Sequence, residues 1–180
     1  MRKKLKKNKI SKNWLSKQRR DIYVRKSKLE GYRSRAIYKL KEIDDKFKII
    51  KNGIKVVDLG SAPGSWSQYL AEKSKNSKIV SIDLKKVDKI DKVHHLIGDF
   101  LDEKNQILIS NFFQDKLDLV VSDMAVNTTG NKNLDAISTG ELTLNAMNFS
   151  IKYLKKNGSF LSKIFMGSTF NEIVKNAKKN

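Results

Sequence analysis

Residues 55–66 constrain the fold of this chain more than any other stretch, and they read Lys-Val-Val-Asp-Leu-Gly-Ser-Ala-Pro-Gly-Ser-Trp. The apolar pair Val56-Val57 is typical of a buried parallel strand, and a glycine-bearing turn and helix-forming sequence follow at once. A strand that leads through such a loop into a helix is the ligand-binding corner of a doubly wound α/β sheet. Gly60 lets the chain reverse, and Gly64 lets a ligand approach bare backbone where the helix begins.

The spacing of these glycines, and the acid before them, narrow the choice of ligand. A dinucleotide-binding loop needs the pattern G-x-G-x-x-G, whereas here Asp58 precedes the loop and only two glycines follow. The resulting pattern, D-x-G-x-x-P-G, is associated with S-adenosylmethionine (SAM) sites. An ordinary strand-to-helix turn is the alternative interpretation, because a glycine pattern alone is weak evidence.

From residue 55 onward, apolar runs alternate with helix-like segments, which predicts a mostly parallel α/β sheet with helices on both faces. The predicted strands are 55–59, 78–82, 94–97, 117–122 and 159–165. The predicted helices are 33–47, 65–72, a long helix opened by a capping box at Ser138, and 171–179. Asn157-Gly158 is expected to end the long helix.

The helix predicted at 33–47 is amphipathic, and its apolar stripe is expected to consist of Ala36, Leu40, Ile43 and Phe47. Lys39 lies at the border of that stripe, which makes it a candidate functional residue, although a border lysine commonly only covers apolar surface. A shorter helix before it is expected to pack on the domain through Trp14, Leu15, Ile22, Tyr23 and Val24.

Each of the first four predicted strands ends on or next to an aspartate: Asp58, Asp83, Asp99 and Asp123. Ligands of open parallel sheets bind outside the carboxyl ends of the strands, so four acids would surround one crevice. Asp83 follows the glycine loop by about 20 residues, where an acid accepts hydrogen bonds from ribose hydroxyls. Asp99 could accept from an exocyclic adenine amine. The alternative is that aspartate is simply common where a strand gives way to a turn.

The formal net charge of +19 is concentrated at the N-terminus. Residues 1–51 contain 20 Lys and Arg against 5 Asp and Glu, whereas the rest of the chain contains 18 against 14. Such an asymmetry indicates a polyanionic partner, either nucleic acid or an anionic membrane. A lysine-rich compositional bias is the alternative, but a bias would be spread over the whole chain.

Composition excludes several classes of site. The chain has no cysteine, which rules out a disulfide framework, a cysteine metal site and a cysteine nucleophile. Its two histidines are adjacent and would point to opposite faces of a strand, so we expect no metal site. No apolar run approaches the length of a membrane span, and the basic N-terminus lacks the apolar region of a secretory signal. We expect a cytoplasmic, monomeric protein of one globular domain without a membrane association.

Taken together, the motifs resemble those of the FtsJ/RrmJ-type family of ribosomal RNA large-subunit 2′-O-methyltransferases. They run in order over nearly the whole chain. The matching stretches are Arg33-Ser34-Arg35-Ala36, Tyr38-Lys39-Leu40, Val56-Val57-Asp58-Leu59-Gly60, Ala62-Pro63-Gly64-Ser65-Trp66-Ser67-Gln68-Tyr69, Gly98-Asp99-Phe100, Val121-Ser122-Asp123-Met124-Ala125 and Lys163.

The resemblance implies a Rossmann-like SAM-dependent methyltransferase domain at 52–180, behind a basic arm and helices at 1–51 that contact RNA. The substrate it implies is a uridine ribose of large-subunit ribosomal RNA in the assembled, or nearly assembled, subunit. The cofactor residues it implies are Gly64, Trp66, Asp83, Asp99 and Asp123. The catalytic residues it implies are Lys39, Asp123 and Lys163.

The chemistry of methyl transfer suits these residue types. The ribose 2′-oxygen must lie in line with the sulfonium methyl group, and its proton must be drawn off as the bond forms. Lys163 can take this proton if its amine is partly neutral. If the amine stays charged, it orients the hydroxyl and stabilises the developing alkoxide. The residues alone leave both roles open.

Two departures from the family pattern bear on activity. Position 126 is Val where the family has Pro, and the final strand pair, which carries a fourth catalytic residue (a Glu), has no counterpart before Asn180. We therefore expect a SAM-fold core with a reduced free energy of unfolding. A non-catalytic RNA-binding or ribosome-assembly factor on the same fold is the main alternative. A methyltransferase for small molecules or proteins fits the basic N-terminus less well, and a nicotinamide oxidoreductase least.

Overall fold

The computed structural model describes residues 21–125 and 129–179. Along the chain its elements are α2 (Ile22–Leu29), α3 (Ile37–Phe47), β1 (Lys55–Leu59), α4 (Ser65–Lys73), β2 (Lys78–Asp83), β3 (Val93–Ile97), α5 (Glu103–Phe113), β4 (Leu117–Ser122), α6 (Lys132–Tyr153), β5 (Leu154–Ser162) and α7 (Phe170–Ala177). The proposed basic arm at the N-terminus, with Trp14 and Leu15, and the Val126 position lie outside the described residues. No described helix is long and apolar enough to cross a membrane.

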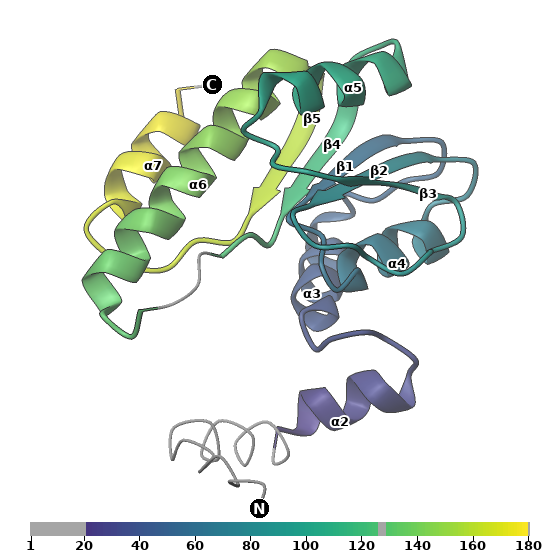
Figure 1. The fold of residues 1–180 in the computed structure, drawn as a ribbon, viewed down its shortest axis with the longest axis horizontal. Coiled ribbons are helices and arrows are strands. Elements are labelled where there is room, and N and C mark those ends of the chain that lie inside the picture. Colours follow the sequence, from purple (N-terminus) through teal and green to yellow (C-terminus); the bar gives the residue numbers. More distant parts are fainter. Residues whose placement is uncertain (1–20, 126–128, 180) are drawn as a thin grey trace, which may run out of the picture.

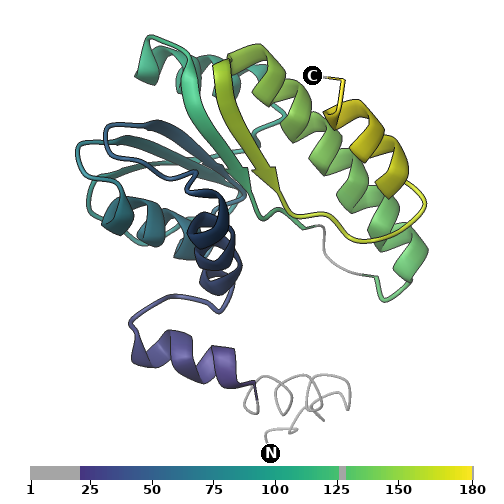
Figure 2. The ribbon, with the colours of Figure 1, turned by 180° about the vertical axis from the view of Figure 1, so that it is seen from behind.

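The described strands form one parallel sheet in the order β3-β2-β1-β4-β5 (Figures 1 and 2). Residues alternate across the sheet, so Val56 and Val57 enter different cores. Val56 packs with α3 and α4, whereas Val57 packs with α5 and α6. Helix α7 lies against α6 on the side away from the sheet, as both ribbon views show. The predicted parallel α/β sheet with helices on both faces is therefore confirmed.

The long helix and the last strand begin earlier than the sequence predicts. Helix α6 starts at Lys132, because the side chain of Asn131 caps it by accepting from the backbone N–H groups of Asn133 and Leu134. The capping-box sequence at Ser138 lies inside the helix. Asn157 does not end the helix either but lies within β5, with a left-handed φ of 67°.

Asn157 marks a bulge between β4 and β5. The register advances from Leu117 to Leu119 on β4 while β5 advances from Leu154 to Ser159. The extra residues of β5 include Asn157 and Gly158, which tolerate the unusual backbone. A turn signal at the edge of a sheet thus corresponds to a bulge and not to a helix terminus.

The buried face of α3 also differs from the predicted stripe. It consists of Ile37, Leu40 and Asp44, whereas Phe47 is 63% exposed. The preceding helix α2 is only lightly attached, because Ile22 and Tyr23 remain largely exposed, although the Tyr23 ring contacts an α3 tyrosine. Residues 103–113 form α5, where the sequence analysis predicts no helix.

Asp44 is a buried charge that joins three segments. One carboxylate oxygen accepts from the backbone N–H of Ile50, at 2.9 Å, and the other accepts from the Tyr69 hydroxyl of α4, at 3.2 Å. Burial and the charge of Asp44 raise the pKa of Tyr69 above its ordinary value, so the phenol stays protonated and donates. Asp44 thereby fixes the position of α3 relative to α4 and to the segment that precedes β1.

We expect Asp44→Ala to lower the free energy of unfolding by about 2–4 kcal/mol, because it leaves two buried donors without partners. The neighbouring Asp45→Ala is the matched control, since Asp45 is exposed and its loss should cost less than about 0.5 kcal/mol. Urea unfolding of both variants measures the difference. Equal midpoints for the two variants would contradict the role given to Asp44.

Candidate functional site

A cavity of about 510 Å³ lies at the carboxyl ends of β1, β2, β3 and β4, where an open parallel sheet binds ligands. Its wall combines three acidic side chains with bare glycine backbone and a group of apolar side chains. It is lined by Gly60, Ala62, Ile82, Asp83, Leu84, Lys85, Gly98, Asp99, Phe100, Leu101, Asp123, Met124, Ala125 and Leu142.

Three of the four strand-end aspartates reach this cavity, as the sequence predicts. Asp83 accepts from the backbone N–H groups of Ala62 and Lys85, at 2.9 and 2.8 Å, which ties β2 to the glycine loop after β1. Asp99 accepts from the N–H of Leu101 and lines the same space. Asp58 is the exception, because it lies fully buried beneath the loop.

The predicted residues Gly64 and Trp66 lie behind the cavity wall. Gly64 is the N-cap residue of α4, with a φ of 108°, and a side chain there would collide with the guanidinium of Arg33 and with Ile90. The Trp66 side chain is buried in the core, where its ring N–H donates to the carbonyl of Ala36. Any contact of Trp66 with a ligand must therefore come from its backbone and not from its ring.

Lys163 and Asp123 form an ion pair beside the cavity. The Lys163 Nζ lies 2.8 Å from the Asp123 Oδ1 and donates to the Asp123 carbonyl at 2.7 Å. Both side chains are more than four-fifths buried, and the Lys163 carbonyl accepts from Thr143 of α6. Lys163, at the end of β5, is thus held by Asp123 through its amine and by α6 through its carbonyl, so the amine has a fixed position beside the cavity.

Lys39 is not joined to that pair in this structure. It is exposed on α3, and within residues 21–125 and 129–179 its amine makes neither a hydrogen bond nor an ion pair. Its predicted catalytic role stays a prediction.

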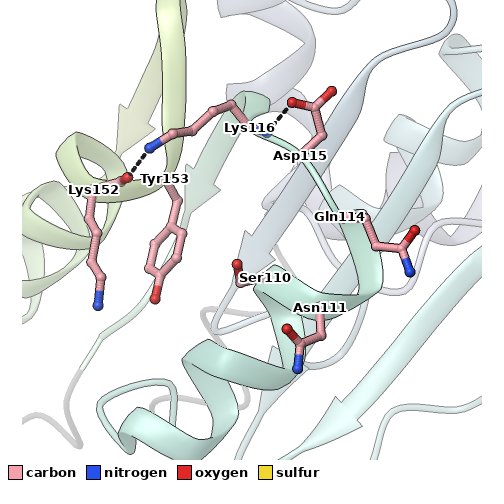
Figure 3. Close-up of a pocket in the computed structure, with 7 residues that line it drawn as sticks. All are labelled: Ser110, Asn111, Gln114, Asp115, Lys116, Lys152 and Tyr153. Carbon is pink, nitrogen blue, oxygen red and sulfur yellow. Dashed lines mark hydrogen bonds between the residues drawn. The ribbon is translucent and has the colours of Figure 1, made fainter.

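A second hollow, of about 610 Å³, lies between the C-terminal ends of α5 and α6 (Figure 3). It is at the amino end of β4, away from all the predicted site residues. Its lining includes Asn111, Gln114 and Tyr153, and Lys116 bridges its upper edge by donating to the carbonyl of Lys152. Nothing in this lining suggests chemistry.

Comparisons with known proteins agree with the geometry. Residues 32–180 match the family model described as FtsJ-like methyltransferase. The chain belongs to the FtsJ-like methyltransferase family. FtsJ-like relatives named ribosomal RNA large subunit methyltransferase E include a Pelagibacter ubique protein, 59% identical over 97% of this chain and 86% of its own, and a Legionella pneumophila protein, 48% identical over 94% and 84%.

A solved structure supports the same FtsJ-like fold. A Plasmodium falciparum protein assigned as a ribosomal RNA methyltransferase superposes with a TM-score of 0.77 and 34% sequence identity. The match covers 82% of this chain and 86% of that protein. The resemblance found in the motifs is therefore confirmed over most of the chain.

Sequence reasoning missed the apolar residues of the FtsJ-like cavity, although a local signal was present. Leu84 follows Asp83, Phe100 follows Asp99, and Met124 follows Asp123. Each is the residue directly after a strand-end aspartate, where the chain leaves the strand and forms part of the cavity wall. Leu84 is 71% exposed, so its side chain offers apolar surface that a ligand in the cavity could cover.

Asp58 is a buried acid with one unpaired oxygen. Its Oδ2 accepts from the Ser67 hydroxyl at 2.6 Å, whereas its Oδ1 has no hydrogen-bond partner among the described residues. Burial raises the pKa of Asp58 to about 7; the hydrogen bond from Ser67 opposes this shift, and the charges of Asp123 and Asp83 add to it. Near neutral pH a carboxylic acid and a carboxylate thus coexist at this position.

We expect Asp58→Asn to remove a pH-dependent loss of stability. Between the ordinary aspartate pKa and about 7, the folded state holds a proton that the unfolded state has released, so the free energy of unfolding falls as pH rises through this window. The amide of the variant cannot ionise, so its free energy of unfolding does not fall in this way. The difference in free energy of unfolding, variant minus wild type, should therefore increase by about 2 kcal/mol between about pH 5 and pH 8.

Urea unfolding at several pH values measures this difference. Asp91→Asn, at an exposed loop position, is the control and should track the wild type. A difference between the Asp58→Asn variant and the wild type that does not change with pH would contradict the assignment.

Proposed function

We propose that this FtsJ-like protein transfers a methyl group from SAM to a ribose 2′-hydroxyl of large-subunit ribosomal RNA, at a uridine of the assembled or nearly assembled subunit. The observation that carries the proposal is the Lys163–Asp123 pair beside an acidic cavity at the carboxyl end of the sheet. The names of the relatives, which denote methyltransferases of the large ribosomal subunit RNA, support the choice of substrate.

The cavity fits the cofactor in charge and in polarity. Asp83, Asp99 and Asp123 line it with a single lysine, which suits a ligand that carries a sulfonium and an ammonium group. Asp83 would hold the ribose hydroxyls, and Asp99 the adenine amine. Leu84 and Phe100 would pack on the adenine ring. When bound, SAM supplies an electrophilic methyl group to the substrate oxygen.

Gly64 and Trp66 would contribute backbone alone. Trp66 lies in the first turn of α4, where free N–H groups and the helix dipole favour a negatively charged group such as the carboxylate of the cofactor's methionine part. This role agrees with a Trp66 ring that is buried in the core. The N–H of Gly64, just before the helix, already donates to the Ser61 carbonyl, so Gly64 would contribute only the space left by its missing side chain.

Lys163 would orient the attacking oxygen. An ammonium has three donors; the Asp123 carbonyl takes one and the Asp123 carboxylate faces a second, so a third is left for a ribose hydroxyl. A donor aimed at that oxygen stabilises the charge that develops on it as its proton passes to a solvent water. Asp123 holds the Lys163 amine in place at the edge of the cavity.

The basic N-terminal part, residues 1–51, would hold the RNA. In its described portion, α2 carries Arg25, Lys26 and Lys28. Figure 1 shows α2 beyond α3, on the side toward which the arrow of β5 points. A strand of RNA that contacts α2 could therefore reach the end of β5, and α3, which carries Lys39, lies between the two in this view.

We expect Lys163→Ala to lower the rate of methyl transfer at least about 100-fold, because the attacking oxygen loses its donor. The affinity for SAM should change less than about threefold, since Lys163 does not line the cavity. Lys156→Ala, at an exposed position of the same strand, is the matched control and should keep the wild-type rate. Tritiated-methyl SAM and large subunits that lack the modification provide the assay.

The same assay separates the alternatives. Label in a nuclease-resistant 2′-O-methylated dinucleotide establishes the reaction. SAM binding without any label would favour a non-catalytic assembly factor, and label in protein would favour another substrate class. A Lys163→Arg variant that keeps part of the rate would favour orientation over proton removal, since arginine does not deprotonate.

A further inference from the structure

The guanidinium of Arg33 is bound to three backbone carbonyls. Its Nη1 donates to the carbonyls of Pro63 and Asp88, at 3.1 and 2.9 Å, and its Nη2 donates to the carbonyl of Lys89 at 3.0 Å. A planar fork of donors suits such a cluster of oxygens, and a point charge on a flexible stem does not. Without a cation, three carbonyl dipoles would converge unopposed.

The three carbonyls belong to two segments that form one wall of the cofactor cavity. Pro63 lies in the loop after β1, next to Ala62, which lines the cavity. Asp88 and Lys89 lie in the segment after β2, which begins with the lining residues 83–85. A hydrogen bond from the Ala62 N–H to Asp83 joins the two segments at the cavity, and Arg33 joins them again further out.

Arg33 is itself held by α4. Its backbone N–H donates to the side chain of Gln68, which in turn donates to the carbonyl of Gly31. The next residue, Ser34, shares a hydrogen bond with Ser65 at the start of α4. The main chain at Arg33 is therefore fixed against α4, and the guanidinium holds both loops at a set distance from that helix.

The glycine at position 64 is consistent with this arrangement. A Cβ there would lie 2.7 Å from the Arg33 Nη1, so any side chain would displace the guanidinium. Glycine at position 64 therefore leaves room for the guanidinium of Arg33, whether or not it also leaves room for a ligand.

We propose that Arg33 is a positioning residue for the cofactor, which sets the spacing of the 60–64 loop and the 84–89 segment without touching the ligand. The inference rests on the proposed use of SAM. Loss of the guanidinium frees the two segments to separate, and Asp83, Leu84 and Ala62 then no longer meet the ligand together. The affinity for the ligand falls, while the Lys163–Asp123 pair, which follows β4 and β5 and has no contact with Arg33, keeps its position.

The test is the SAM affinity of Arg33→Ala and Arg33→Lys in the full chain, measured by calorimetry. We expect a loss of about tenfold or more for Arg33→Ala and an intermediate loss for Arg33→Lys, whose ammonium reaches fewer of the carbonyls. The rate at saturating SAM should stay within about threefold of the wild type, so the effect falls on KM for SAM and not on kcat.

Arg35→Ala is the matched control, because that neighbouring guanidinium pairs with Asp21 and contacts neither loop. Its SAM affinity should stay within about twofold of the wild type. Thermal unfolding of each variant shows whether it is folded, and Arg33→Lys serves the test if Arg33→Ala is not.

Wild-type affinity in the folded Arg33 variants, or a fall in kcat with KM unchanged, would overturn the proposal. A wild-type chain that binds no SAM would instead overturn the proposed function on which it rests. The two failures are therefore distinguishable in one set of titrations.

Discussion

The parallel register of β1 with its two neighbours determines where the acids of the site lie. Asp58 of β1 pairs with Ser81 on one side and Val121 on the other. Asp83 and Asp123 each lie two residues further along, so their side chains emerge at the same edge and on the same face of the sheet. The sheet itself, and no single loop, thus brings the carboxylates together.

This register gathers carboxylates that repel one another, and the structure meets the repulsion in three ways. Asp83 accepts two backbone N–H groups, Asp123 pairs with Lys163, and Asp58 has a pKa near neutrality. A cationic ligand would relieve the remaining repulsion, because each carboxylate favours positive charge nearby. The cavity thus has more acidic than basic side chains in its wall, which agrees with the binding of SAM that we propose.

Much of the fold could be predicted because its signals are local; the errors come partly from distant contacts and partly, at the start of α6, from a competing local cap. Four of the five strands are predicted to within a residue or so, since each is a short apolar run followed by an acid or a turn. The acids of the cavity followed from the strand ends. The burial of Asp44 could not be foreseen, because its partner Tyr69 comes from another helix, and the true start of α6 depended on Asn131 and not on the capping box. The position of Gly64 behind the wall depends on Arg33, some thirty residues earlier in the chain.

The contacts of Arg33 have an evolutionary consequence. All three of its acceptors are main-chain oxygens, so the hold on the two loops does not depend on which side chains those loops carry. In the segment after β2, Lys85 lines the cavity, whereas Lys86 and Lys89 do not. Substitution of these two exposed side chains can therefore change the surface charge while the main-chain contacts of Arg33, and with them the cavity wall, stay the same. The segment can thus vary at its surface and keep its shape where it borders the cavity.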